Sequence, residues 1–195
     1  MKNNALKSGF TLVELLVVIA IIAALATASV AAFSGASRGA KKKQSEAIAY
    51  ALESAIEQYH IKYGSFPPPV EKAATAWAGE SIPLDTTSAD AQVLCEELTG
   101  KNANINYRAV DFLPLQNAKQ NKNGFTYSGV DFSGIVDGFG NPLYILFDYD
   151  YDGSITVPTG YTNEGTAIRA KVLVYSPGLD LTPGNADDVY TWKSL

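Results

Sequence analysis

A long stretch without proline, residues 10–63, constrains the fold of this chain most. Its first part, residues 10–33, is almost entirely apolar, and its only formally charged side chain is Glu14. As a helix this part is about 36 Å long, which is enough to cross a hydrocarbon layer about 30 Å thick. Lys2 and Lys7 precede it and favour a cytoplasmic N-terminus. The sequence therefore predicts a membrane-spanning helix over residues 10–33.

The second part of the stretch, residues 34–64, has a different helical pattern. From Ile48 to Tyr63, apolar side chains recur at helical spacing along one stripe, and glutamates lie away from it. Gly64 follows at the position that a helix C-cap prefers, and the prolines at 67–69 prevent continuation. We therefore expect one nearly continuous helix whose amphipathic second half packs against a domain.

The remaining residues, 65–195, are expected to form a globular head. A short helix is predicted over Ala89–Leu98, stopped by Gly100. Segments rich in Val, Ile, Tyr and Phe, separated by turn residues, are typical of strands; they are GFTYSGV (124–130), PLYILFDY (142–149), SITVP (154–158) and AKVLVYS (170–176). The predicted class is α+β, with a long N-terminal helix packed on a small antiparallel sheet.

Composition makes several functions improbable. The 15 Lys and Arg residues are outnumbered by 20 Asp and Glu, so no basic footprint for nucleic acid is expected. Cys95 is the only cysteine, which rules out an intrachain disulfide and predicts a buried thiol. The only histidine, His60, lies beside the apolar stripe, and the common catalytic motifs are missing from the sequence. We therefore expect no enzyme activity.

Glu14 is a functional candidate because of where it lies. A carboxylate within an apolar membrane helix costs about 2.5–3.5 kcal/mol on insertion scales, so it needs a partner. Residues 10–33 contain no cationic side chain, so a second chain must supply the positive charge. Cleavage between Gly9 and Phe10 would create an α-amino group, which an identical neighbour shifted along the helix axis could present to Glu14.

The segment KSGFTLVELLVVIAIIA (7–23) resembles the leader and N-terminal helix of type IV prepilins and of type II secretion pseudopilins. The resemblance implies that residues 1–9 are a leader, which a prepilin peptidase removes after Gly9 before Phe10 is methylated. It also implies that Glu14 sets the register of subunits in a homo-oligomeric filament. Further segments resemble major pseudopilins, with Gly138 and Phe139 where that family usually has Pro and Trp; these segments are 55–68, 137–145 and 174–192.

The preferred interpretation is a major pseudopilin of type II secretion. It implies a single-pass protein of the bacterial inner membrane with its head in the periplasm. An assembly platform and minor pseudopilins would then move it from the lipid bilayer into a periplasmic or cell-surface filament that drives protein export. One alternative is a type IV pilus pilin for adhesion, motility or DNA uptake. Another is a secreted soluble calcium- or carbohydrate-binding module, cut by a general signal peptidase near residues 26–28.

The resemblance to major pseudopilins also implies a calcium ion in the last loop. This loop is rich in Gly, Pro and Asn, and it carries oxygen ligands of the type that calcium prefers. Three acids close together repel one another unless solvent screens them or a cation neutralises them, so a solvated acidic turn is the alternative. The candidate ligands are Ser176, Asp180, Asp187 and Asp188.

A second acidic group, DYDYDG (148–153), matches the first half of an EF-hand loop. Asp148, Asp150 and Asp152 occupy the ligand positions, but Thr159 stands where the bidentate Glu is expected. We favour a different interpretation, in which Asp152 and the glycine after it form a hairpin turn between the strands on either side. A weak metal site remains the alternative.

Overall fold

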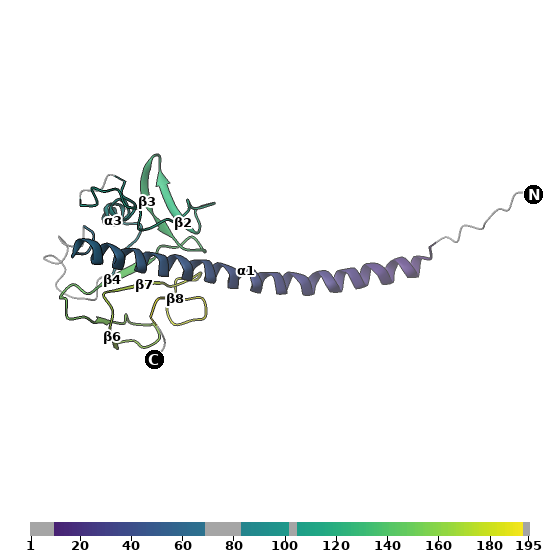
Figure 1. Cartoon of the computed structure of the whole chain (residues 1–195). Helices are drawn as coiled ribbons and strands as arrows, with labels where there is room; N and C mark the ends of the chain where they lie inside the picture. The colour runs from purple at the N-terminus through teal and green to yellow at the C-terminus, as the bar shows by residue number, and fades with distance from the viewer. Residues whose placement is uncertain (1–9, 69–82, 102–104, 193–195) are drawn as a thin grey trace, which may run out of the picture. The chain divides into compact units, whose positions relative to one another are not determined.

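The computed structural model describes residues 10–68, 83–101 and 105–192. The predicted leader, with Gly9, lies outside the described residues. The chain divides into two compact units, Met1–Gly39 and Ala40–Leu195, which are described separately below. Helix α1 (Leu12–Tyr63) contributes its first half to one unit and its second half to the other (Figure 1). A long helix followed by antiparallel strands confirms the predicted α+β class.

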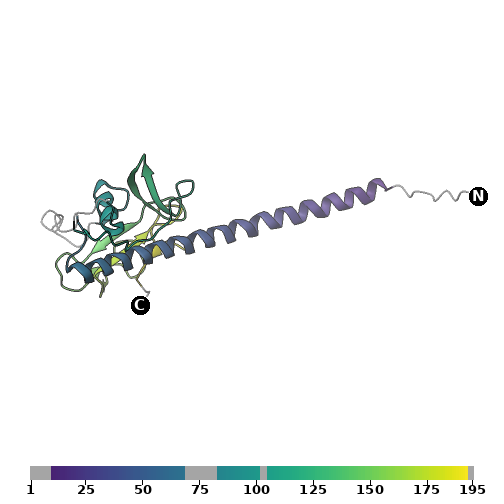
Figure 2. The same ribbon diagram turned by 45° about the horizontal axis from the view of Figure 1, so that its top comes forward.

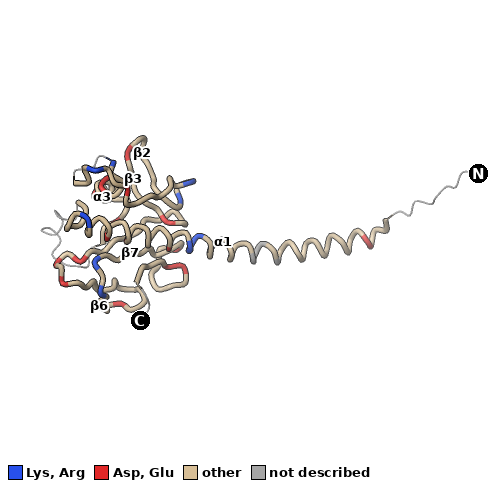
Figure 3. The backbone as a smooth tube through the Cα atoms, in the orientation of Figure 1, with Lys and Arg blue, Asp and Glu red and all other residues tan. Residues whose placement is uncertain are grey.

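The first unit is the N-terminal half of α1. Charged residues are rare in this half (Figure 3). Residues 10–33 were expected to cross a membrane, but no helix within the described residues combines the length and the apolar character that a crossing requires. The large apolar side chains near the start of α1 are exposed; they are Phe10, Leu12, Val13, Leu15, Leu16, Val17, Val18, Ile19, Ile21, Ile22 and Leu25.

The second unit contains a four-stranded antiparallel sheet in the order β1-β4-β7-β8. The central strands β4 and β7 pair along their length, with Ile145 opposite Val174. Two further ribbons, β2–β3 and β5–β6, are each antiparallel. The strands are β1 (Leu84–Asp85), β2 (Gly124–Ser128), β3 (Asp131–Val136), β4 (Tyr144–Phe147), β5 (Ile155–Thr156), β6 (Ala167–Ile168), β7 (Val172–Ser176) and β8 (Val189–Tyr190).

The core forms where the second half of α1 meets the sheet. The predicted stripe of α1 is confirmed, since Leu52, Ile56 and Tyr59 are completely buried. Alternate strand residues contact this core, as the two-residue repeat of a strand requires; they are Ile145, Phe147, Val172 and Val174. The residues between them point to the other face of the sheet, where Tyr175 and Trp192 belong to a second, aromatic cluster.

Helix α3 (Ala89–Thr99) confirms the short helix that the sequence predicts, with its end one residue later. The Ser88 hydroxyl caps its first turn by accepting a hydrogen bond from the Ala91 N–H (3.2 Å). Gly100 closes it in the left-handed conformation that helix C-caps favour. Cys95 lies on its buried face, and burial raises the pKa of the thiol to about 12. Figures 1 and 2 show α3 and the β2–β3 ribbon together on one side of the end of α1.

The predicted hairpin across Asp152 is wrong. Strand β4 pairs with β1 and β7, whereas β5 pairs with β6. Residues 148–153 form an irregular loop, in which the Asp148 carboxylate accepts hydrogen bonds from the N–H groups of Asp152 (3.1 Å) and Gly153 (3.0 Å). These bonds curl the chain around Asp148, so β5 leaves the direction of β4 and starts a separate ribbon.

Candidate functional site

The candidate assembly residue, Glu14, takes part in a hydrogen-bonded cap at the start of α1. Its carboxylate accepts from the Thr11 N–H (2.8 Å) and from the Thr11 hydroxyl (2.7 Å). In return, the Glu14 N–H donates to the Thr11 hydroxyl oxygen (3.3 Å). This is the reciprocal arrangement of a capping box, in which a Thr before the helix pairs with a Glu three residues later.

The capping box corrects one premise of the sequence analysis. Glu14 has no cationic partner between residues 10 and 33, but it does have hydrogen-bond donors in its own chain. The signal for them was in the sequence, because Thr11-Leu-Val-Glu14 has the Thr-x-x-Glu spacing of the motif. Glu14 can therefore serve two purposes, a local one through hydrogen bonds and an intermolecular one through charge.

In the head, Asp137 organises the loop between β3 and β4. It is fully buried, and one carboxylate oxygen accepts from the N–H groups of Phe139 (2.8 Å), Gly140 (2.9 Å) and Asn141 (2.9 Å). The other oxygen accepts from the Ser176 hydroxyl (2.9 Å) at the end of β7. Burial raises the pKa of the Asp137 carboxyl, while these hydrogen bonds lower it in part. Asp137 was not selected from the sequence. Ser176, which was selected as a calcium ligand, instead donates its hydroxyl hydrogen bond to Asp137.

Gly138 shows why this loop departs from the usual pseudopilin pattern. Its N–H donates to the Ser45 hydroxyl oxygen (2.9 Å), and that hydroxyl donates to the Lys41 carbonyl of α1 (2.9 Å). A proline at 138 would remove the N–H donor. A Cβ atom at 138 would lie only 2.4 Å from the Lys41 carbonyl oxygen. The loop can therefore approach α1 this closely only with glycine.

In the last loop, the carboxylates of Asp180 and Asp187 accept hydrogen bonds from different donors. The Asp180 carboxylate accepts from the Thr182 N–H (2.9 Å) and from the Asn185 amide (3.0 Å). Asp187 instead accepts from the Leu179 N–H (2.6 Å). Asn185, which sequence reasoning did not select, thus fixes one of the predicted acids and also donates its N–H to Asp188 (3.1 Å).

Asp188 differs from the other acids of the loop because it is almost fully buried, at 3% exposed. Its Oδ2 accepts from the N–H groups of Gly184 (2.6 Å) and Asn185 (3.1 Å). Its Oδ1 is buried and has no hydrogen-bond partner in the described part of the chain. Burial raises the pKa of this carboxyl, as does the charge of Asp187, whereas the two N–H donors and Lys42 lower it. A buried acceptor without a partner is the kind of group that a cation satisfies.

The carboxylates of the acidic group at residues 148–152 lie closer together than those of the last loop. Oxygens of Asp148, Asp150 and Asp152 all lie within 4.8 Å of one another. Among the residues that the structure describes, no other set of three acids, histidines or cysteines converges in this way, so Asp180, Asp187 and Asp188 do not form such a set. Backbone N–H groups already occupy part of the Asp148 carboxylate.

Comparisons with known proteins agree with the N-terminal features. Residues 4–30 match the family model described as the prokaryotic N-terminal methylation motif. A fimbrial protein of Neisseria meningitidis serogroup B (strain ATCC BAA-335 / MC58) is 32% identical over 77 residues, which are 40% of this chain and 45% of the relative. The type IV major pilin protein PilE1 of Neisseria gonorrhoeae is 33% identical over 64 residues, or 33% of this chain and 39% of the relative.

The match spans less than half the length of these curated relatives. No solved structure matches the chain. The methylation motif covers the segment that contains Phe10, Thr11 and Glu14, and the fold combines a long N-terminal helix with an antiparallel sheet. These findings show that the chain carries the methylation motif of prepilin-type proteins and is similar over part of its length to type IV pilins.

Proposed function

We propose that this chain is a structural, non-catalytic subunit of a helical filament of the type II secretion pseudopilus. The observation that carries the proposal is the exposed apolar surface at the start of α1, which contains a single carboxylate. Large contiguous apolar surfaces on soluble proteins mark interaction sites. Burying one Leu, Val or Ile side chain contributes about 1.5–3 kcal/mol, so association of many such helices is strongly favoured.

The partner that best fits this surface is a second copy of the same helix. Copies staggered along the axis bury their apolar side chains against one another, and the freed amino group of Phe10 meets Glu14 of the neighbour. Two observations support this: the methylation motif at residues 4–30 and the relatives named as fimbrial or pilin proteins. Before assembly, the precursor is anchored in the bacterial inner membrane with its head in the periplasm. A prepilin peptidase, an assembly platform and minor pseudopilins act on it in turn.

Mass spectrometry of the mature protein tests the processing step. The expected N-terminus is an N-methylated Phe10, because cleavage after Gly9 frees the amine that the assembly model requires. A mature chain that starts near Ser29 would instead indicate a general signal peptidase and a secreted soluble module. A chain that keeps residues 1–9 in purified filaments would contradict the proposal directly.

A pilin of a type IV pilus is the second candidate, since the Neisseria relatives carry pilin names. The two filament systems can be separated by deleting the gene. Loss of secreted proteins from the culture supernatant, with surface fibres unchanged, is expected for a pseudopilin. Loss of surface fibres and of motility with normal secretion would assign the chain to a pilus.

We also propose that the last loop binds calcium. The orphaned Oδ1 of Asp188 supports this, because a buried carboxylate oxygen without a donor is costly unless a cation contacts it. Asp180 is exposed and Asp187 is half-buried, and both carboxylates belong to the same loop. With one cysteine in the whole chain, no disulfide can fasten this loop, so a cation would supply the missing cross-link.

Calcium is expected to raise the melting temperature of the wild-type head by roughly 5 °C at about 100 times the dissociation constant. The variant Asp188→Asn should lose most of this gain. In EDTA it should be at least as stable as the wild type near pH 7, because a raised pKa means that the fold disfavours the ionised carboxylate. Differential scanning calorimetry with calcium and with EDTA measures both effects.

Asp150→Asn serves as the matched control for the calcium experiment, since it removes one charge from the other acidic group. Retention of the calcium effect in this variant, together with its loss in Asp188→Asn, assigns the ion to the last loop. The reverse pattern would move the ion to residues 148–152. An unchanged melting temperature of the wild type in calcium would remove the ion from both places.

A further inference from the structure

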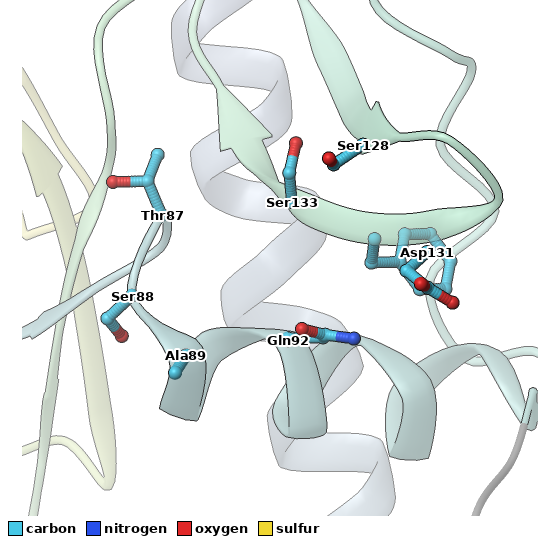
Figure 4. Close-up of a pocket in the computed structure, with 8 residues that line it drawn as sticks. Thr87, Ser88, Ala89, Gln92, Ser128, Asp131 and Ser133 are labelled. Carbon is cyan, nitrogen blue, oxygen red and sulfur yellow. The ribbon is translucent and has the colours of Figure 1, made fainter.

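A polar cavity lies between the start of α3 and the β2–β3 ribbon, and none of the candidate site residues discussed above lines it. Its volume is about 380 Å³, within the range of small-molecule sites. Gln92 lines the cavity from α3, and Asp131 and Ser133 line it from the ribbon, although in the view of Figure 4 the Ser133 side chain points away from α3. Asp131 and Ser128 are exposed, so the cavity opens to solvent.

Some polar groups that line the cavity are free to bind a ligand, although the Ser133 hydroxyl donates to Thr126 (3.0 Å) and the Thr87 hydroxyl donates to Asp85 (2.7 Å). In the described part of the chain, the Asp131 carboxylate and the Ser128 hydroxyl have no hydrogen-bond or ion-pair partner. The Ser88 hydroxyl accepts from the Ala91 N–H and keeps its own proton free to donate. Gln92 makes only a long contact with Glu96 (3.4 Å). Donors and acceptors are therefore both available on the cavity wall.

The walls are also fixed in place before any ligand arrives. The Thr86 hydroxyl donates to the Ile135 carbonyl (2.7 Å), and the Ile135 N–H donates to the Thr86 carbonyl (3.1 Å). These bonds hold β3 against the segment that leads into α3. On the ribbon, the Phe132 ring stacks on Tyr127 at 4.9 Å between centroids. A cavity with a rigid frame loses little conformational entropy when it binds a ligand.

The charge and polarity of the lining residues indicate which class of ligand the cavity can bind. Among the described residues that line the cavity, Asp131 alone is formally charged, which disfavours phosphate, sulfate and other anions there. The Lys101 ammonium is close by, 5.1 Å from the Phe132 ring centroid, but it does not line the cavity. Hydroxyl, amide and carboxylate groups provide poor surroundings for an apolar ligand. A ligand with several adjacent hydroxyls, each able to donate and accept, matches both kinds of group at once. Two neighbouring hydroxyls can donate to the two oxygens of Asp131, and Phe132, which also lines the cavity, offers a small apolar contact.

From this geometry we propose that the cavity binds one residue of a neutral sugar. Asp131 accepts from vicinal hydroxyls of the sugar, and Gln92 and the serine hydroxyls complete the polar contacts. The site belongs to the head alone, so it does not depend on the role of Glu14 or on filament assembly. It gives the head a ligand-binding surface in addition to its structural role.

Saturation-transfer NMR on the full chain tests the proposal. The chain is kept in a zwitterionic detergent without a sugar headgroup, so that the detergent cannot compete. The probes are D-glucose, D-galactose and N-acetyl-D-glucosamine at millimolar concentration, with inorganic phosphate as a charged probe. At least one sugar is expected to receive saturation, with its contact on vicinal ring positions, and phosphate is expected not to bind.

Asp131→Asn should weaken the binding of that sugar at least tenfold, because the amide replaces one acceptor by a donor. Glu57→Gln, the same chemical change at an exposed position on α1, should leave binding unchanged. Since Asp131 is exposed and unpartnered, its variant is expected to melt at the wild-type temperature, which circular dichroism checks. No saturation of any sugar, equal binding by Asp131→Asn, or equal weakening by Glu57→Gln would each overturn the proposal.

Discussion

Replacing Glu14 with glutamine is expected to reduce incorporation of the subunit into filaments at least tenfold, while cleavage after Gly9 continues. Glutamine can still accept from the Thr11 N–H, so the capping box at the start of α1 persists. What the substitution removes is the negative charge, which the proposed contact with the amino group of a neighbouring Phe10 requires. Immunoblots of sheared filament and membrane fractions measure the distribution of the subunit.

Thr11→Ala is the matched control, because it removes the hydroxyl of the cap and keeps the carboxylate. Loss of an N-cap side chain costs about 1 kcal/mol of helix stability, which a helix of 52 residues tolerates. Assembly of this variant is therefore expected to continue. If Glu14→Gln assembled normally and Thr11→Ala did not, the function of Glu14 would be to start the helix, and the charge-pairing model would be wrong.

The sequence predicted the elements with dense, regular patterns and failed where pairing depends on distant residues. The stripe from Ile48 to Tyr59 repeats over several turns, so α1 and its buried face followed directly. Strands β4 and β7 were found because their apolar residues are contiguous. Strand β5 was found within the predicted segment 154–158, whereas the two-residue strands β1, β6 and β8 carry too few residues for a pattern. The false hairpin at Asp152 shows a local turn signal overruled by the longer pairing of β4 with β7.

The candidate sites show the same limit at the level of single side chains. Asp180, Asp187 and Asp188 were grouped because they are close in sequence, yet the loop turns one inward and ties the others to different donors. The directions of the Asp180 and Asp188 carboxylates depend on contacts with Asn185, which no motif marks. Asp137 was overlooked as a buried hub because an Asp among Gly and Asn is also the ordinary composition of a turn. Only the cap at Thr11 had a sequence signal that went unused.

Replacing Gly138 with alanine is expected to lower the free energy of unfolding of the head by about 3 kcal/mol, at the upper end of overpacking effects. The new Cβ would lie 2.4 Å from the Lys41 carbonyl oxygen and 3.1 Å from the Ser45 hydroxyl oxygen. The first contact is with the backbone of α1, which cannot retreat as a flexible side chain can. The loop would have to move to remove this clash. The movement would stretch the hydrogen bond from the Gly138 N–H to Ser45 and disturb the N–H groups that donate to the Asp137 carboxylate. Denaturant unfolding of the full chain in detergent measures the loss.

Gly39→Ala provides the comparison, because a Cβ at that helical position meets nothing within 4 Å. Alanine is favoured over glycine inside a helix by about 1 kcal/mol, so this variant should unfold at the same or a higher denaturant concentration. Ser45→Ala separates the two parts of the Gly138 effect, since it leaves the buried N–H without its acceptor and is expected to cost about 1–3 kcal/mol. Equal losses from Gly39→Ala and Gly138→Ala would show that the close approach to α1 does not limit position 138. A Gly138→Ala loss that vanishes in the Ser45→Ala background would assign the whole effect to the hydrogen bond, because a steric clash with the Lys41 carbonyl would persist there.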